Sequence, residues 1–348
     1  MATAAATGTI LITGANGGLG SAMVQHIISK PELAAYHGLY TVRDTTHAPD
    51  LTTALAHGTA HSYDIMSLDL ARLDSVRQAA ESINSRISAG VIPPIRALIL
   101  NAGFMDFGKQ SWTADKLETA FAVNYLGHWL LTMLLLKSID KENGRVVIIG
   151  SHTHDTNDPR HAVNKAFADP KYKYFLSDAD SFHAIAKGKW STETEDASFR
   201  GGYRRYGASK YLQITMQHEL QARLNADAAL NKICVVGVDP GPMISGLQRL
   251  APWFIRVLIF RIIYALILYL KPINGMIRST TRSASDVLEA VFVVDEEGNP
   301  PKDKYWDGRT PSETSEESRD VSKRELVWKE TVKLAGLKEG ETVLANWS

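Results

Sequence analysis

Two residues four positions apart, Tyr206 and Lys210, could together transfer a proton. Residues at this spacing share one face of a helix, so the Lys210 ammonium can lie beside the Tyr206 phenol. A neighbouring positive charge favours the phenolate and lowers the pKa of a tyrosine from about 10 toward neutral pH, where it is a usable acid or base. A solvated helix face carries the same pair equally well, so the rest of the sequence must decide.

Other polar residues follow apolar runs that are typical of buried strands. They are Asn101 after Ala97–Leu100, Ser151 after Val146–Ile149, and Asp239, Pro240 and Gly241 after Ile233–Val238. Active sites of open α/β sheets lie at the carboxyl ends of the strands, so these residues are expected to meet at one edge of a sheet. Asn124, in a helical pattern, is a further candidate.

A glycine cluster, Thr13 to Gly20, follows the first apolar run. Gly14 can make a tight turn, Gly18 allows the backbone to approach a pyrophosphate, and Gly20 allows a helix to pack closely on the strand. The unpaired N–H groups and the positive dipole end of that helix would then face the phosphates. Alone, the cluster could be only a turn, but its place between a strand and a helix favours a dinucleotide site.

Strand-like and helical patterns alternate along the chain. The expected strands are Thr9–Ile12, Gly38–Val42, Ala97–Leu100, Val146–Ile149 and Ile233–Val238, and the expected helices are Ser21–Ile28, Leu73–Ile87, Ala114–Leu136, Tyr206–Leu224 and Lys323–Leu334. Residues 300–320 are polar and charged and are expected to form a surface loop. The alternation predicts an α/β Rossmann fold, a doubly wound parallel sheet with helices on both faces.

Over roughly residues 8–250 the chain resembles the short-chain dehydrogenase/reductase family. The motifs that carry the resemblance are TGxxxGxG at Thr13–Gly20, an NNAG-type element at Leu100–Gly103, Asn124, Ser151, YxxxK at Tyr206 and Lys210, and PG at Pro240 and Gly241. The resemblance implies that Tyr206 donates or accepts the proton and that Ser151 binds the carbonyl oxygen. It also implies that Lys210 holds the nicotinamide ribose and tunes Tyr206, and that Asn124 supports a water in the proton relay.

The resemblance also implies a set of cofactor-binding positions, among them Asp69 in the adenine pocket. The full set is Thr13, Gly14, Asn16, Gly18, Leu19, Gly20, Arg43, Asp69, Leu70, Asn101, Ala102, Gly103, Tyr206, Lys210, Pro240, Gly241, Met243 and Ser245. Within the family, the runs at 42–44, 123–128 and 305–308 are most similar to the retinol-dehydrogenase and WW-domain-oxidoreductase branch, with a weaker similarity to fungal tailoring reductases.

The cofactor is expected to be NADP. An NAD site places an acidic residue at the end of the second strand, whereas an NADP site places an arginine nearby for the 2′-phosphate. Here Val42 stands at the acidic position and Arg43 follows it. Asp44 keeps NAD open as the alternative.

Two features depart from the compact members of the family. Ser151 and Tyr206 lie much further apart than usual, so residues 152–205 are expected to be an insertion near the active site. Gly17 also permits the TGxxGxxG pattern of the extended, epimerase-like branch, although Asn101-Ala102-Gly103 argues against that branch. We expect a single domain, residues 8–348, with a substrate-covering segment at 242–281 and a C-terminal extension at 300–348.

The run Trp253–Leu270 is apolar on nearly every helical face and must be covered by substrate, a partner subunit or a membrane. Arg256 and Arg261 interrupt it, so a full span, which needs about 20 largely uncharged residues, is not expected. Shallow peripheral membrane contact and a homodimer stay open. Because the family covers its substrate here, we expect a lipophilic substrate such as a terpenoid, steroid, retinoid or polyketide.

Composition excludes several other classes. The 38 basic and 38 acidic side chains cancel, so no nucleic-acid partner is expected. Cys234 is the single cysteine and lies in an apolar run, and the first residues lack a signal peptide, so a cytoplasmic location is expected, with membrane association open. His152 and His154, with nearby aspartates, form no complete ligand set, so no metal is expected.

The sequence therefore predicts an enzyme that interconverts a secondary alcohol and a ketone, or an alcohol and an aldehyde, with NADP(H). An epimerase or dehydratase of the extended branch is the first alternative. A non-catalytic NADP(H)-binding sensor is the second, but such proteins typically lack the Tyr/Lys pair.

Overall fold

An eight-stranded sheet forms the centre of the molecule, and the computed structural model describes residues 6–56, 61–253, 256–270 and 277–348. The strands are β1 (Thr9–Thr13), β2 (His37–Val42), β3 (Tyr63–Ser67), β4 (Ile95–Leu100), β5 (Arg145–Ile149), β6 (Cys234–Asp239), β7 (Tyr305–Asp307) and β8 (Thr310–Pro311). Their order is β3-β2-β1-β4-β5-β6-β7-β8, and only the β7–β8 pair is antiparallel. The order reverses between β1 and β4, which is where open α/β sheets bind ligands.

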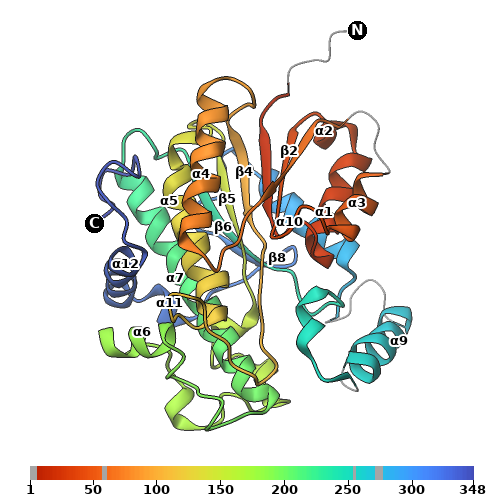
Figure 1. Cartoon of the computed structure of the whole chain (residues 1–348), viewed down its shortest axis with the longest axis vertical. Coiled ribbons are helices and arrows are strands. Elements are labelled where there is room, and N and C mark those ends of the chain that lie inside the picture. Colours follow the sequence, from red (N-terminus) through yellow and green to blue (C-terminus); the bar gives the residue numbers. More distant parts are fainter. Residues whose placement is uncertain (1–5, 57–60, 254–255, 271–276) are drawn as a thin grey trace.

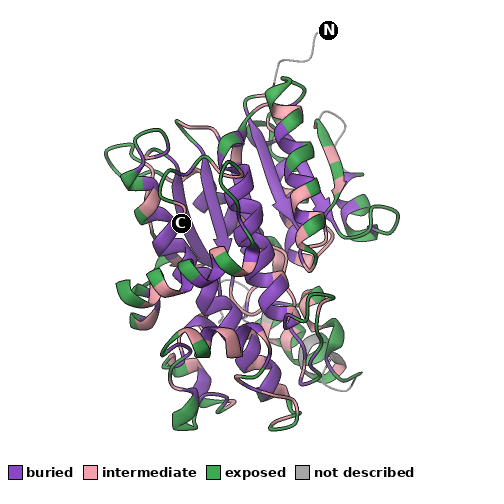
Figure 2. Ribbon diagram, turned by 60° about the vertical axis from the view of Figure 1, so that its left-hand side comes forward, coloured by how far each residue is buried: buried purple, intermediate pink, exposed green. Residues whose placement is uncertain are grey.

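Helices cover both faces of this sheet (Figure 1). One face carries α1 (Gly18–Ser29), α2 (Pro31–Ala34), α3 (Pro49–Leu55) and α10 (Thr280–Phe292), and the other carries α4 (Leu73–Ser88), α5 (Gly127–Leu135) and α7 (Phe199–Ala226). β1, β2, β4, β5 and β6 are buried along their whole length or nearly so, as expected for strands covered on both sides (Figure 2). The predicted doubly wound α/β fold is confirmed.

The helix predicted over Ala114–Leu136 begins later than expected. Residues 112–118 form a turn in which Lys116 has a positive φ of 57° and Trp112 bridges to Glu118. A π-helix, η1 (Phe121–Leu126), then leads into α5, and a short 3-10 helix, η2 (Leu136–Ser138), follows. The helix predicted from Tyr206 instead begins at Phe199, so Tyr206 lies two turns inside α7.

The polar stretch 300–320 is not entirely a surface loop, because it contains β7. Tyr305 pairs with Gly237 of β6 and is almost fully buried. Two glycines make the room for its ring: a Cβ on Gly150 would lie 2.5 Å from the Tyr305 hydroxyl, and a Cβ on Gly237 would lie 2.6 Å from its ring. Because these glycines have no side chains, the Tyr305 ring fits beside them and β7 can pair with β6.

The insertion and the C-terminal extension pack on the α5–α7 side. The insertion contains η3 (His152–His154), η4 (Pro159–Ala162), η5 (Pro170–Tyr172) and α6 (Ala179–Ala186), and the extension contains α11 (Glu316–Arg319) and α12 (Val321–Ala335). The rings of Trp129 and Trp328 meet at 5.2 Å, and the hydroxyls of Tyr125 and Thr331 are 2.6 Å apart. α12 thus covers the hydrophobic core on this side. The helix predicted at Lys323–Leu334 is confirmed.

The segment between β6 and α10 stands apart from the body (Figure 1). It contains η6 (Gly246–Leu250), a second π-helix, η7 (Arg256–Ile263), and α9 (Tyr264–Leu270), while Phe254 and Ile255 lie outside the described residues. We expected the run Trp253–Leu270 to be covered by substrate, a partner subunit or a membrane. In the single chain, many of its described side chains are exposed. Within the described residues, no helix has the length and apolar character needed to cross a bilayer.

Candidate active site

Ser151 and Tyr206 lie in direct contact at the carboxyl end of β5. Ser151 follows the strand and caps η3, accepting a hydrogen bond from the Thr153 N–H at 3.3 Å. Its side chain also lies close enough to the Tyr206 hydroxyl to lower the pKa of that phenol. The structure therefore brings together the two residues expected to hold and protonate a carbonyl oxygen, despite the insertion of residues 152–205 between them.

Lys210 is buried one turn after Tyr206 on α7. Its ammonium donates to the Ile149 carbonyl at 2.7 Å and to Gln213 Oε1 at 2.8 Å. It lies 5.5 Å from the centre of the Tyr206 ring. Burial lowers the pKa of Lys210 to about 7, although the Asp239 carboxylate acts in the opposite direction. The predicted Tyr/Lys pair is thus part of the protein interior and not a solvated helix face.

The pKa of Tyr206 departs from the expectation that Lys210 would lower it. Burial, the Asp239 carboxylate and Tyr203 all raise this pKa well above its ordinary value, and the hydrogen bond from Ser151 offsets them only in part. Tyr206 is therefore protonated at neutral pH and is positioned to act as an acid.

Asn124 links the loop after β4 to α7. It lies in η1, and its Oδ1 accepts from the Phe104 N–H at 2.7 Å. Its Nδ2 donates to the Phe104 carbonyl at 2.9 Å and to Ser209 Oγ at 2.8 Å. Because Ser209 in turn donates to the Tyr206 carbonyl, the amide of Asn124 positions the turn of α7 that carries Tyr206.

The glycine loop is fastened to the loop after β4. Thr13 Oγ1 accepts from the N–H groups of Asn101 and Ala102 at 2.9 and 3.0 Å, and Asn101 Nδ2 donates to the Thr13 carbonyl at 2.8 Å. Gly14 has a φ of 65°, and a Cβ there would lie 2.8 Å from Ala102 Cα, so the turn requires glycine.

The start of α1 fits a phosphate-bearing cofactor. The N-cap is Gly17, whose lack of a side chain leaves the first amides of the helix without a side-chain acceptor. Ser245 packs against Gly18, where a Cβ would approach Ser245 Cα to 3.2 Å, and Gly20 lies against the Gly14 carbonyl. Leu19 is buried in the core beneath this turn.

The remaining cofactor positions differ in what they contact. Arg43 is exposed at the end of β2, and Asp69 accepts from the Ala71 N–H at 3.1 Å while Leu70 packs against Gly127. Asn16 accepts from the Leu51 N–H at 3.1 Å and so joins the glycine loop to α3. The set at this edge of the sheet is completed by Gly103, after β4, and by Pro240, Gly241, Met243 and Ser245, after β6.

Sequence comparisons agree with this geometry. A model of the short chain dehydrogenase family matches residues 8–163. The short-chain dehydrogenase iccH of Talaromyces variabilis is 40% identical over 361 residues, which cover 98% of this chain and 99% of that protein. The chain belongs to the short-chain dehydrogenase/reductase family. It is accordingly an oxidoreductase that acts on carbonyl or alcohol groups with a nicotinamide cofactor.

Other short-chain dehydrogenases/reductases are similar at greater distance. The protochlorophyllide reductase of Daucus carota is 29% identical over 342 residues, covering 95% of this chain and 78% of that protein. The structure of NADPH-bound carbonyl reductase from chicken fatty liver has a TM-score of 0.56 and 16% identity, covering 89% of this chain and 100% of that chain. The latter likeness shows the shared fold.

One residue of this short-chain dehydrogenase was not assigned a role from the sequence. Asp239 ends β6, directly before Pro240 and Gly241, and is buried. Its carboxylate accepts from the His152 N–H at 2.8 Å and from the Gly241 N–H at 2.8 Å. Burial raises the pKa of this carboxyl, but the His152 side chain, the Gly241 N–H and the Arg160 charge together hold it far below the ordinary range. The sequence predicted that Asp239 lies at a strand end, but it did not predict the contacts with His152, Gly241 and Arg160.

Charged residues from three segments surround Asp239. Arg160 of the insertion lies 3.7 Å from its carboxylate and 3.0 Å from that of Asp307 in β7. Arg278, just before α10, donates to the Asp239 carbonyl at 3.1 Å and to Asp307 at 2.6 Å. This network joins the insertion, the sheet and the end of the 242–281 segment beside Tyr206.

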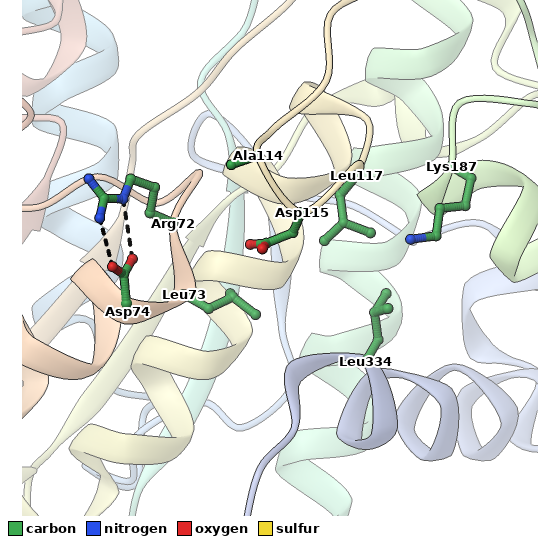
Figure 3. Close-up of a pocket in the computed structure, with 8 residues that line it drawn as sticks. All are labelled: Arg72, Leu73, Asp74, Ala114, Asp115, Leu117, Lys187 and Leu334. Carbon is green, nitrogen blue, oxygen red and sulfur yellow. Dashed lines mark hydrogen bonds and ion pairs between the residues drawn. The ribbon is translucent and has the colours of Figure 1, made fainter.

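A cavity of about 710 Å³ lies away from these residues (Figure 3). It is lined by Arg72, Leu73, Asp74, Ala114, Asp115, Leu117, Lys187 and Leu334, which come from α4, the turn before η1, the end of α6 and α12. None of the expected catalytic residues lines it, and Arg72 and Asp74 pair with each other across an exposed surface. We assign it no role in the reaction.

His152 and His154, which the sequence places near aspartates, form hydrogen bonds with other groups. His154 Nδ1 lies 2.6 Å from the Ser151 carbonyl, and His154 Nε2 accepts from the Ser315 N–H at 3.1 Å. His152 Nε2 lies 3.0 Å from the Tyr203 hydroxyl. Among the described residues, His, Cys, Asp and Glu side chains form no group of three that could hold an ion.

Proposed function

We propose that the chain is an NADPH-dependent reductase that converts a ketone or aldehyde on a lipophilic small molecule into an alcohol, and catalyses the reverse reaction when the product is supplied. The observation that carries the proposal is the contact between Ser151 and a protonated Tyr206, with Lys210 buried one helical turn away. An acid hydrogen-bonded to a second hydroxyl is what protonation of a carbonyl oxygen requires.

The residues divide the reduction between them. Ser151 donates a hydrogen bond to the carbonyl oxygen, and Tyr206 transfers its phenolic proton to the same oxygen. A bound reduced nicotinamide supplies the hydride that the carbonyl carbon receives. Carbon and oxygen have then gained a hydride and a proton, which gives the alcohol and leaves Tyr206 as a phenolate. The Lys210 ammonium beside its ring stabilises that anion until a proton returns.

NADP is supported by the charges at the end of β2. Arg43 is exposed there, and the pKa of the Arg249 guanidinium in η6 is lowered by burial and, second, by the charge of Arg43. Two neighbouring guanidinium groups favour a phosphate between them. Asp44, the residue that would favour NAD, accepts hydrogen bonds from the Thr46 N–H at 2.9 Å and the Thr46 hydroxyl at 2.6 Å.

A lipophilic substrate is supported by the composition and position of the 242–281 segment. It starts at Gly241, passes over Gly18 at Ser245, and brings Leu247 to within 3.8 Å of a Cβ placed on Gly103. The apolar helices that follow extend from the same edge of the sheet (Figure 1). Apolar side chains of this segment that lie beside the carboxyl edge, Met243 and Leu247 among them, favour an alicyclic or polyketide-like molecule over a sugar.

Oxidation of NADPH with a panel of lipophilic and small polar ketones tests this proposal, with NADH in parallel. We expect turnover on lipophilic ketones, measured as the loss of NADPH absorbance with stoichiometric formation of alcohol. Conversion of a substrate without net loss of NADPH would indicate the epimerase or dehydratase alternative. Binding of NADPH with no turnover on any carbonyl would indicate a sensor and contradict the proposal.

A further inference from the structure

Helices η7 and α9 present an apolar surface to solvent. Leu258, Ile262 and Leu266 follow one another at intervals of four, and Tyr269 and Leu270 continue the same stripe. Each of these side chains is more than half exposed, and Tyr269 is 83% exposed. We call these five residues the apolar face. Trp253, 70% exposed, precedes the stripe on the same segment.

This exposure is unusual for a folded chain. Single exposed leucines are common, but a continuous exposed stripe indicates a contact with something apolar. In Figure 1, α9 lies away from the sheet and its covering helices. By contrast, the sheet and the helices against it are mostly buried (Figure 2), and their large apolar side chains form the core.

The charges in the same segment are of one sign. From Pro242 to Arg282 the sequence has no aspartate and no glutamate. Its charged residues are Arg249, Arg256, Arg261, Lys271, Arg278 and Arg282. Acidic and basic residues are equal in number over the whole chain, so this excess is a local property. Arg261, on η7 beside the stripe, is exposed.

Both ends of the segment are fixed to the body. At one end Ser245 packs against Gly18, and at the other Arg278 bonds to the Asp239 carbonyl and to Asp307. The segment that carries the apolar face therefore leaves and rejoins the body at the carboxyl edge of the sheet, which is the edge that carries Ser151 and Tyr206.

We propose that the apolar face docks on a membrane surface that contains anionic lipid. Leucine and isoleucine would enter the boundary between headgroups and acyl chains, and Trp253 and Tyr269 are the residue types that prefer that boundary. Arg261 would remain at headgroup level and pair with a lipid phosphate, because its stem can extend along the helix. The docking does not depend on which carbonyl compound is reduced.

Charge favours lipid over a second copy of the chain. A twofold dimer through the apolar face would bring the same basic segment of each copy to the interface, with no acidic residue between 242 and 282 to pair with it. Anionic headgroups supply the missing negative charge. The helices are too short to cross a bilayer, so the contact is at the surface.

Sedimentation with vesicles tests the docking. The purified full chain is mixed with vesicles of phosphatidylcholine alone or of phosphatidylcholine with phosphatidylserine, and the bound fraction is measured. We expect strong binding to the anionic vesicles that weakens as salt is raised, and weaker binding to the neutral ones. Leu258→Ser and Leu266→Ser should each weaken binding by roughly tenfold, because each removes an apolar side chain from the bilayer boundary.

Matched variants separate the apolar face from general surface effects. Val163→Ser changes an apolar side chain that is 91% exposed elsewhere and should bind like the wild type. Arg261→Glu should reduce binding to anionic vesicles, whereas Lys329→Glu, on the exposed side of α12, should not. Thermal unfolding of each variant confirms that it is folded.

Several results would overturn the proposal. One is failure of the wild type to bind anionic vesicles. Another is loss of binding in the control variants to the same degree as in the face variants. A third is a dimer, seen by analytical ultracentrifugation, that does not bind vesicles and that Leu266→Ser converts to monomer. That last result would assign the apolar face to a second copy.

Discussion

The Asp239 carboxylate accepts a hydrogen bond from the backbone N–H of His152 at 2.8 Å, which fixes the residue that follows Ser151. Asp239 also accepts from Gly241, so one buried anion holds the loops that leave β5 and β6. Its charge reaches two groups of the proposed mechanism, because it raises the pKa of both Tyr206 and Lys210. A residue with no direct part in the chemistry thereby keeps the acid protonated.

Asp239→Asn should move the alkaline limb of the pH profile for reduction to lower pH. Without the negative charge, the pKa of Tyr206 falls, and the pKa of Lys210 falls below its present value of about 7. Both groups would then lose their protons at lower pH, and reduction needs both in the protonated form. The measurement is kcat/KM for carbonyl reduction across the pH range.

Several other groups face Asp239, and one of them provides a control for the pH profile of Asp239→Asn. They are His152 of η3, Arg160 of η4, Tyr203, Tyr206 and Lys210 of α7, Tyr305 and Asp307 of β7, and Arg278. Asp307→Asn removes a charge from the same network while leaving Asp239 in place, and its alkaline limb should stay near that of the wild type. Equal shifts in both variants would show that the network acts through structure alone.

Tyr206→Phe should abolish reduction while leaving cofactor binding nearly unchanged. The variant keeps the ring that packs above Lys210 and removes only the proton donor, so kcat should fall by about 10²–10⁴-fold. NADPH affinity, measured by fluorescence titration, should change little. Turnover equal to that of the wild type would contradict the role of Tyr206 as acid.

A buried ion pair beside this site should contribute to stability. Arg205 Nε donates to Asp106 Oδ2 at 2.9 Å, and Arg205 Nη1 donates to the Ser191 carbonyl at 2.7 Å, so the pair joins the loop after β4, the insertion and α7. Both side chains are almost fully buried. Asp106→Asn leaves the guanidinium without its counter-charge and should lower the free energy of unfolding by about 3–5 kcal/mol.

Chemical denaturation measures that loss, and an exposed pair provides the comparison. Lys232 and Glu142 are both mostly exposed, so Glu142→Gln should change the free energy of unfolding by less than about 1 kcal/mol. A loss of similar size in both variants would show that burial does not set the strength of the Asp106–Arg205 pair.

The sequence predicted the elements whose patterns are long and periodic. The apolar runs that became β1, β4, β5 and β6 were found within a residue or two, because strands buried on both faces are almost entirely apolar. Ser151 and Tyr206 were paired correctly across the insertion, because each lies in a local motif whose position on a strand end or helix is independent of loop length.

Other features depend on contacts that no local pattern records. β7 has only three residues in a polar stretch, and it exists because Gly150 and Gly237 leave space for Tyr305. The raised pKa of Tyr206 comes from burial and, second, from Asp239, which lies far along the chain in β6. β3, with alternating exposed and partly buried residues at the sheet edge, lacks the apolar run that revealed the central strands.

The last prediction concerns the choice between NADP and NAD. Arg43 lies at the end of β2, and burial together with the positive charge of Arg43 lowers the pKa of Arg249 in η6. A 2′-phosphate would relieve the repulsion between these two positive charges, whereas the ribose hydroxyl of NAD would not.

Arg43→Ala should therefore weaken NADPH binding by roughly tenfold or more, and should leave NADH binding nearly unchanged or slightly improved. Arg249→Ala should act in the same direction, and the double variant should lose less than the product of the two single effects if both guanidiniums bind one phosphate. Arg324→Ala, far along the chain in α12, is the charge-matched control. Titration of both reduced cofactors against the wild type, the two single variants, the double variant and the control measures these affinities. Equal affinities of the wild type for NADPH and NADH would remove the basis for NADP preference, since no phosphate contact would then be gained at Arg43.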